Sequence, residues 1–216
     1  MIGALIAILK RRPVVKSLPK SAANARDFLD TLSDLGGRLD RKEISKNEFL
    51  FTAENELKFL AEASFLEGAG TKFFFDTESE QYLSDWVREQ AKWLPGLIDA
   101  IKTNGMDDNV RRRLNLWGDS LAAVGGIGHI MANRDVYGTW ISGDTNRSCD
   151  TCDELNGVRK PLGWFLDHGY IPGQPGSKSL SCGGWGCCCR IVDDEEKRLL
   201  PIVWRWQKKP RYITSL

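Results

Sequence analysis

The placement of the cysteines constrains this chain more than any other feature of its sequence. The segment that holds them, residues 149–189, contains eight glycines and three prolines, with few periodic apolar positions. Such a segment buries too little surface to fold unaided, so we expect a cross-link or a metal ion to hold it together. All six cysteines of the 216-residue chain fall in this one window, as Cys149, Cys152, Cys182, Cys187, Cys188 and Cys189.

The spacing of the cysteines favours a metal site. A Cys-x-x-Cys turn presents two thiolates to one ion, and a second pair from a distant turn completes a tetrahedral site. Cys149 and Cys152 form the first pair, Cys187 with Cys189 is the favoured second pair, and Cys182 is a competing ligand. Neither of the two histidines has metal-ligand spacing, which favours one closed structural Zn²⁺ site over a catalytic one. Zinc binding of about 10 kcal/mol or more would order a segment of this size.

Other states of the cysteines remain open at this point. They could be buried free thiols, or disulfides formed in an extracellular particle or after cell lysis. A redox-active Cys-x-x-Cys is disfavoured because the strand–helix pattern of a thioredoxin-like domain is absent around it.

The apolar segment Met1–Leu9 precedes the charges of Lys10–Arg12, the reverse of a signal peptide, and it is too short to span a bilayer. We therefore expect a reducing cytosol at synthesis, no membrane span, and an apolar arm that packs on its own body or on a partner.

The remaining pattern predicts a mainly α fold. Apolar residues recur at helical spacing in about four stretches: 21–35, ended by Gly36-Gly37; 45–70, begun by a Ser45–Glu48 capping box; 77–101, begun by a Thr77–Glu80 box and interrupted by Pro95; and one that begins at 107. The fourth stretch runs to about 121, and the glycines at 125, 126 and 128 either break it there or mark close helix contact within a helix that continues to about 135. The predicted organisation is an N-terminal arm (1–20), a helical body (21–135), a small irregular or β cysteine-rich module held by zinc (136–195) and a C-terminal tail (196–216).

Charge and motifs argue against an enzyme. Thirty basic residues oppose twenty-nine acidic ones, which gives no global reason to bind nucleic acid or a membrane. Phosphate-binding glycine loops and nucleophile elbows are missing. His129 is predicted as a packed or surface helix residue, and the run from Asp193 to Glu196 as a solvated acidic turn. The basic runs 111–113 and 208–211 are most simply solvated surfaces.

Two segments of the module resemble a known family. The stretch from Trp140 to Gly157 and the stretch from Cys182 to Arg190 are similar to the C-terminal module of the Mu F-like minor head (head morphogenesis) proteins of tailed phages. The resemblance implies that the family's paired ligand positions are Cys149, Cys152, Cys187 and Cys189, with Trp140 and Trp185 packed beside them. The histidine–proline pair that usually precedes the last cysteines is absent here, which keeps Cys182 as a substitute ligand.

The same resemblance implies a structural role. It predicts a non-catalytic minor capsid protein, present in several copies in the phage head and assembled in the host cytoplasm. Its partners would be the portal or the major capsid protein, with a possible contact to packaged DNA. The rival hypothesis is a zinc-module nucleic-acid-binding protein whose basic runs contact phosphates. A metal-dependent nuclease is disfavoured by the shortage of histidines.

Overall fold

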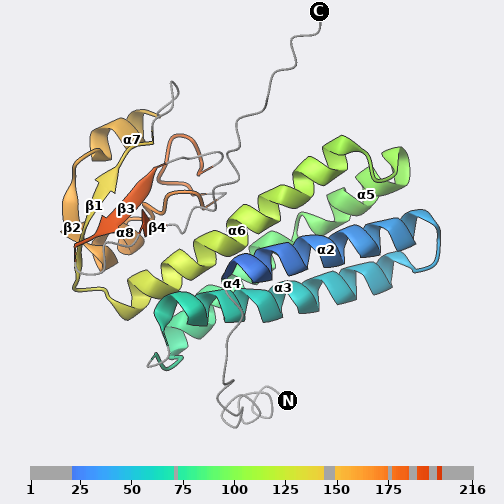
Figure 1. The fold of residues 1–216 in the computed structure, drawn as a ribbon, viewed down its shortest axis with the longest axis horizontal. Helices are drawn as coiled ribbons and strands as arrows, with labels where there is room; N and C mark the ends of the chain where they lie inside the picture. The colour runs from blue at the N-terminus through green and yellow to red at the C-terminus, as the bar shows by residue number, and fades with distance from the viewer. Residues whose placement is uncertain are drawn as a thin grey trace, which may run out of the picture.

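A computed structural model of the chain describes residues 21–70, 73–143, 149–174, 177–184, 189–194 and 199–200. These residues form seven helices and a four-stranded sheet, so the chain is mainly helical with a small sheet toward its C-terminus, as the sequence predicts. In Figure 1 the long helices run side by side along the long axis of the molecule, and the sheet lies at one end of them. Within the described residues, no helix combines the length and the apolar character that a membrane span requires.

The helical body consists of five helices. The longest, α3 and α6, lie against each other, and α2 packs on both of them. The helices are α2 (Ser21–Asp40), α3 (Lys46–Ala69), α4 (Thr77–Ala91), α5 (Leu94–Asn104) and α6 (Asp108–Ala132). The arm lies outside the described residues.

Side-chain caps fix where α3 and α4 begin. Ser45 accepts the backbone N–H of Glu48 at 3.2 Å, and the Glu48 carboxylate accepts the backbone N–H of Ser45 at 2.8 Å. This is the predicted capping box. The helix α4 begins at Thr77 as predicted, but its capping box is formed by the N-cap Asp76 and Ser79, and the predicted Thr77–Glu80 box is wrong.

Of the residues predicted to end or interrupt a helix, Pro95 does so, whereas Gly36 and Gly37 do not. Gly36 and Gly37 do not end α2, which continues to Asp40. A Cβ on Gly36 would lie 2.5 Å from the sulfur of Met106, so this glycine makes room for packing within the helix. Pro95 does interrupt the third predicted helix: α4 ends at Ala91 and Pro95 lies in the first turn of α5, where its missing N–H costs nothing.

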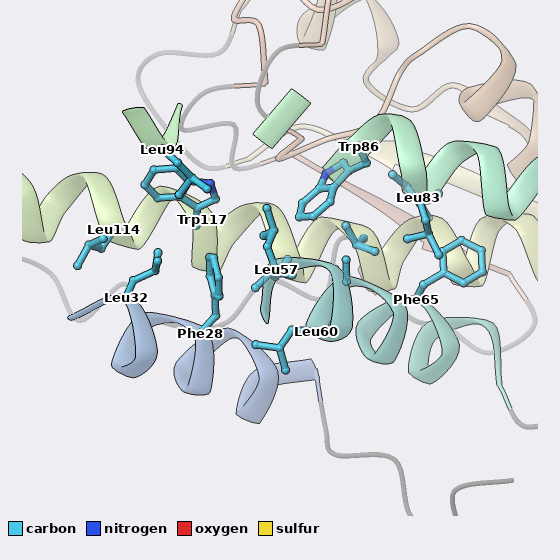
Figure 2. Close-up of a cluster of buried hydrophobic side chains, with 14 of the residues drawn as sticks. Phe28, Leu32, Leu57, Leu60, Phe65, Leu83, Trp86, Leu94, Leu114 and Trp117 are labelled. Atoms are coloured by element: carbon cyan, nitrogen blue, oxygen red, sulfur yellow. The ribbon is translucent and has the colours of Figure 1, made fainter. Parts of the chain in front are cut away.

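The core of the body lies between α2, α3, α4, α5 and α6. In Figure 2 the ring of Phe28 points from α2 toward Trp117 of α6, and Leu57 of α3 lies below Trp86 of α4. All four side chains are buried, with exposed fractions of 5% or less. Burial of apolar surface from five helices stabilises the body, and the same hydrophobic cluster continues into the residues that follow α6.

The sheet belongs to the cysteine module, which comprises β1–β4, α7 and α8. The strand order is β2-β1-β3-β4 and every pairing is antiparallel. Central β1 pairs Tyr137 with Pro161 on one side and Trp140 with Ile191 on the other. The elements are β1 (Tyr137–Ile141), α7 (Asp150–Leu155), β2 (Arg159–Pro161), α8 (Leu162–Asp167), β3 (Arg190–Asp193) and β4 (Leu199–Leu200). β4 is the last described element, and the residues of the tail from 201 onward lie outside the described residues.

Candidate metal centre

The first turn of α7 brings together the thiols of Cys149 and Cys152. Cys149 is the N-cap residue, and its carbonyl accepts the backbone N–H of Asp153 at 3.0 Å. Cys152 follows within the first turn, and the two sulfur atoms lie 3.2 Å apart. The Cys-x-x-Cys spacing therefore places both thiols at one end of a short helix.

Hydrogen bonds fasten α7 to the end of β1. Ser142, just after β1, donates its hydroxyl to the carbonyl of Cys152 at 2.8 Å and its backbone N–H to the side-chain oxygen of Asn156 at 3.0 Å. The carbonyl of Trp140 accepts the N–H of Gly157 at 2.8 Å. The sheet thus holds the helix that carries the first two thiols.

A separate turn delivers the third thiol. The hydroxyls of Thr151 and Ser181 lie 2.5 Å apart, and the backbone N–H of Ser181 donates to the Thr151 hydroxyl at 3.2 Å. Because Thr151 precedes Cys152 and Ser181 precedes Cys182, these bonds align the two cysteine-bearing segments side by side. Gly184 follows with a φ of 75°, and a Cβ there would lie 1.9 Å from a carbonyl oxygen. This position requires glycine for the chain to turn away after Cys182.

Three cysteines therefore form a group that could hold a metal ion. The sulfur atoms of Cys149, Cys152 and Cys182 all lie within 4.8 Å of one another. Cys152 is buried and the other two are half-buried, and none of the three is in a disulfide. Convergent thiols from two turns that are distant in sequence are the donor set expected of a structural metal site.

The surroundings of Cys149 favour the ionised form that binds metals. Burial opposes ionisation of this thiol, but hydrogen bonds from Cys152 and Cys182 outweigh it and hold the pKa of Cys149 below its ordinary value. A lowered thiol pKa increases the fraction of thiolate, which is the species that binds a metal.

Of the other predicted ligands, only Cys182 is seen to join Cys149 and Cys152 among the described residues. It was predicted as a competing ligand. Cys189 directly precedes β3, is 4% exposed and packs with the apolar core, outside the three-thiol group. Cys187 and Trp185 fall in the segment 185–188, which the structure does not describe. The ligand roles of Cys187 and Cys189 stay predictions.

Trp140 lies in the core of the module. Its side chain is fully buried and its ring centroid is 6.1 Å from that of Phe165 in α8. Its backbone N–H donates to the carbonyl of Val158, just before β2, at 2.9 Å, and its backbone pairs with Ile191 in β3. Trp140 therefore anchors β1, the strand that in turn positions α7.

A buried polar pair that the sequence patterns did not indicate joins the module to the helical body. Nε2 of His129 in α6 lies 2.7 Å from the Asp193 carboxylate in β3, and both side chains are 2% exposed or less. The expectation that Asp193 belongs to a solvated turn is wrong, because strand alternation turns this residue inward. The exposed Asp194 does meet that expectation, and it pairs with Arg159 at 2.6 Å.

Comparison of the chain with protein-family models, with curated proteins and with solved structures finds no match. The features of the chain that bear on its function are therefore the three-thiol group and the two sequence segments that carry the resemblance.

Proposed function

We propose that the cysteine module binds one structural Zn²⁺ and serves as the assembly surface of a minor head protein of a tailed phage. The observation that carries the proposal is the convergence of Cys149, Cys152 and Cys182 from two turns that hydrogen bonds hold in register.

Zinc is the metal that suits this donor set best. Thiolates are soft ligands, and a closed tetrahedral site of cysteines is the usual structural zinc site. Three thiols are in place, and Cys187 or Cys189 would supply the fourth, as the resemblance implies. An ion at this point would tie α7 to the turn that carries Cys182, two segments otherwise joined by few bonds.

The phage role is supported by the resemblance of residues 140–157 and 182–190 to the minor head proteins. The division of the chain into a helical body and a small cysteine module is compatible with that role. In it, the module would contact the portal or the major capsid protein inside the head, the protein would be non-catalytic, and zinc would keep the contact surface rigid.

Metal analysis of protein purified under reducing conditions tests the site. We expect about one zinc ion per chain in the wild type. Replacing Cys149, Cys152 or Cys182 singly with serine should lower the zinc content well below stoichiometry, whereas Cys188→Ser, outside the expected ligand set, should not. Cys187→Ser and Cys189→Ser then identify the fourth ligand. A wild-type protein without stoichiometric zinc after zinc supplementation would exclude the metal proposal.

The role requires a separate experiment, performed on particles. Mass spectrometry of purified virions and proheads should detect this chain in several copies, and its absence from both would rule out the head role. A DNA-binding titration distinguishes the rival. Affinity for DNA that falls steeply with salt would favour a nucleic-acid-binding module, because each phosphate contact releases a counterion.

A further inference from the structure

One face of α3 is apolar and yet exposed in the described structure. Phe51 is 72% exposed and Phe59 is 55% exposed, and both point away from the side that packs on α2 and α6. Leu66, half-buried, lies on the same face at helical spacing. Phe51, Phe59 and Leu66 are called the outer stripe below. A surface helix is normally polar opposite its buried face, so this stripe is a candidate docking surface.

One polar side chain beside the outer stripe is turned back onto its own helix. Asn55 lies between the two phenylalanines, but its side-chain N–H donates to the carbonyl of Phe51 at 2.8 Å and so turns back onto the helix. The two rings are eight residues apart, which is about 12 Å along a helix axis. An apolar segment of about two to three helical turns would cover both of them.

We propose that the arm, Met1–Leu9 of the same chain, packs along the outer stripe of α3. The arm is the one long apolar run that precedes the helical body, and as a helix its nine residues would extend about 13 Å. That length matches the separation of Phe51 and Phe59.

Charge complementarity favours the same contact between the arm and α3. The first twenty residues contain five lysines and arginines and no acidic residue, whereas α3 contains five glutamates against two lysines. Lys10, Arg11 and Arg12 directly follow the arm and would lie near this acidic helix. Opposite charges of this kind guide an apolar segment to one surface rather than another.

The connection is long enough for the arm to reach the stripe within one chain. The start of α2 lies beside the C-terminal half of α3 in Figure 1, and the two helices pack on each other. Residues 10–20 separate the arm from Ser21, and an extended chain of that length spans about 35 Å. A tethered segment has a high local concentration at a nearby surface, which favours its own chain over another copy.

Hydrogen–deuterium exchange of the full-length protein tests the proposal. In the wild type, amides of residues 2–9 should exchange roughly tenfold or more slowly than in an unstructured peptide of the same sequence. Phe51→Glu/Phe59→Glu should abolish this protection, while Phe51→Leu/Phe59→Leu should retain most of it. Trp93→Ser removes an equally exposed aromatic ring from the start of α5 and should leave the protection unchanged.

Two controls make each outcome decisive. Unfolding curves of the variants should match that of the wild type closely, because neither phenylalanine belongs to the hydrophobic core, and a matching curve excludes general unfolding as the cause. Protection should also be independent of protein concentration. The proposal fails if residues 2–9 are unprotected, if protection survives the double glutamate variant, or if protection rises with concentration alongside a dimeric mass.

Discussion

At the scale of single residues, the pair His129 and Asp193 shows how the chain satisfies buried polar groups. The side-chain nitrogen of Asn133 donates to the backbone carbonyl of His129 at 2.9 Å, which fixes the orientation of the amide. The same nitrogen lies 3.3 Å from Nδ1 of His129, and Nε2 on the other side of the ring faces the Asp193 carboxylate. These contacts fix the orientation of the imidazole ring between helix and strand.

Removing either partner should destabilise the protein strongly. Asp193→Ala or His129→Ala leaves a buried polar group without its partner, at a cost of about 3 kcal/mol in the free energy of unfolding. The double variant should lose less than the sum of the two, by about 1–3 kcal/mol, because the two side chains share one interaction. Urea unfolding of the four proteins measures this difference.

The exposed pair Arg159 and Asp194 provides the matched control for that cycle. Its members are 56% and 36% exposed, so its coupling should stay within about 1 kcal/mol. Strictly additive effects of the His129 and Asp193 substitutions would show that the 2.7 Å contact contributes no coupling.

The N-cap of α4 gives a prediction that depends on pH. Hydrogen bonds from the backbone and then the side chain of Ser79 hold the pKa of Asp76 below its ordinary value of 3.8. A depressed carboxyl pKa stabilises the fold above the unfolded value and loses that effect as pH falls through the folded value. Asp76→Ala should therefore cost about 1 kcal/mol at pH 7 and less at pH 3. A difference that stays constant between pH 7 and pH 3 would contradict this role of the carboxylate.

These residue-scale features differ in how far the sequence reveals them. The Ser45–Glu48 box is local, because both partners lie within one turn, and it was predictable from spacing. His129 and Asp193 are 64 positions apart and meet only when the sheet docks on α6. A pairing that depends on tertiary contact leaves no local pattern to read.

At the scale of elements, the crossing of α3 and α6 depends on glycines. A Cβ on Gly68 would lie 1.7 Å from the carbonyl oxygen of Gly125, and one on Gly128 would lie 2.1 Å from that of Phe65. The two helix backbones are thus in direct contact at these positions. The sequence left open whether the glycines near position 125 break α6 or permit close helix contact, and the structure shows the contact.

Adding a methyl group at this crossing should separate the helices. Gly128→Ala gains helix propensity of about 1 kcal/mol but clashes with backbone that cannot move alone, so we expect a net loss of about 1–3 kcal/mol. Gly96→Ala in α5 is the control, because nothing lies within 4 Å of its Cβ position, and it should be neutral or slightly stabilising. Thermal unfolding of both variants tests the contrast, and a neutral Gly128→Ala would mean that α3 and α6 can move apart without cost.

At the scale of the whole molecule, the helical body and the cysteine module differ in what stabilises them. The body contributes five helices to the hydrophobic cluster, whereas the module contributes short strands and two six-residue helices to the same cluster. Apart from the buried pair, Arg134 links them, because its guanidinium contacts Glu78 of α4 at 2.9 Å and Asp167 of α8 at 2.5 Å.

The mainly helical class was predictable because helical periodicity is local. The thiol grouping was predictable only in part, because the turn bearing Cys182 depends on bonds to Thr151.

Removal of the metal should therefore affect the two parts unequally. We expect a strong zinc chelator to speed amide exchange in 137–143, 149–167 and 177–193 by tenfold or more, because the module has too small a core to fold without a cross-link. Exchange in α2, α3 and the first half of α6 should change little, since the body packs on the module's helices through α6, which contacts α8. The end of α6 should respond with the module, because His129 loses Asp193 when β3 loosens.

The Cys182→Ser variant distinguishes metal loss from other effects of the chelator. If the site requires this thiol, the variant should show fast exchange in the module already, and the chelator should add nothing. Equal loosening of body and module on chelation would instead mean that the two parts fold as one cooperative unit. Unchanged exchange throughout would mean that the module is held by its own packing around Trp140, with no contribution from an ion at the three thiols.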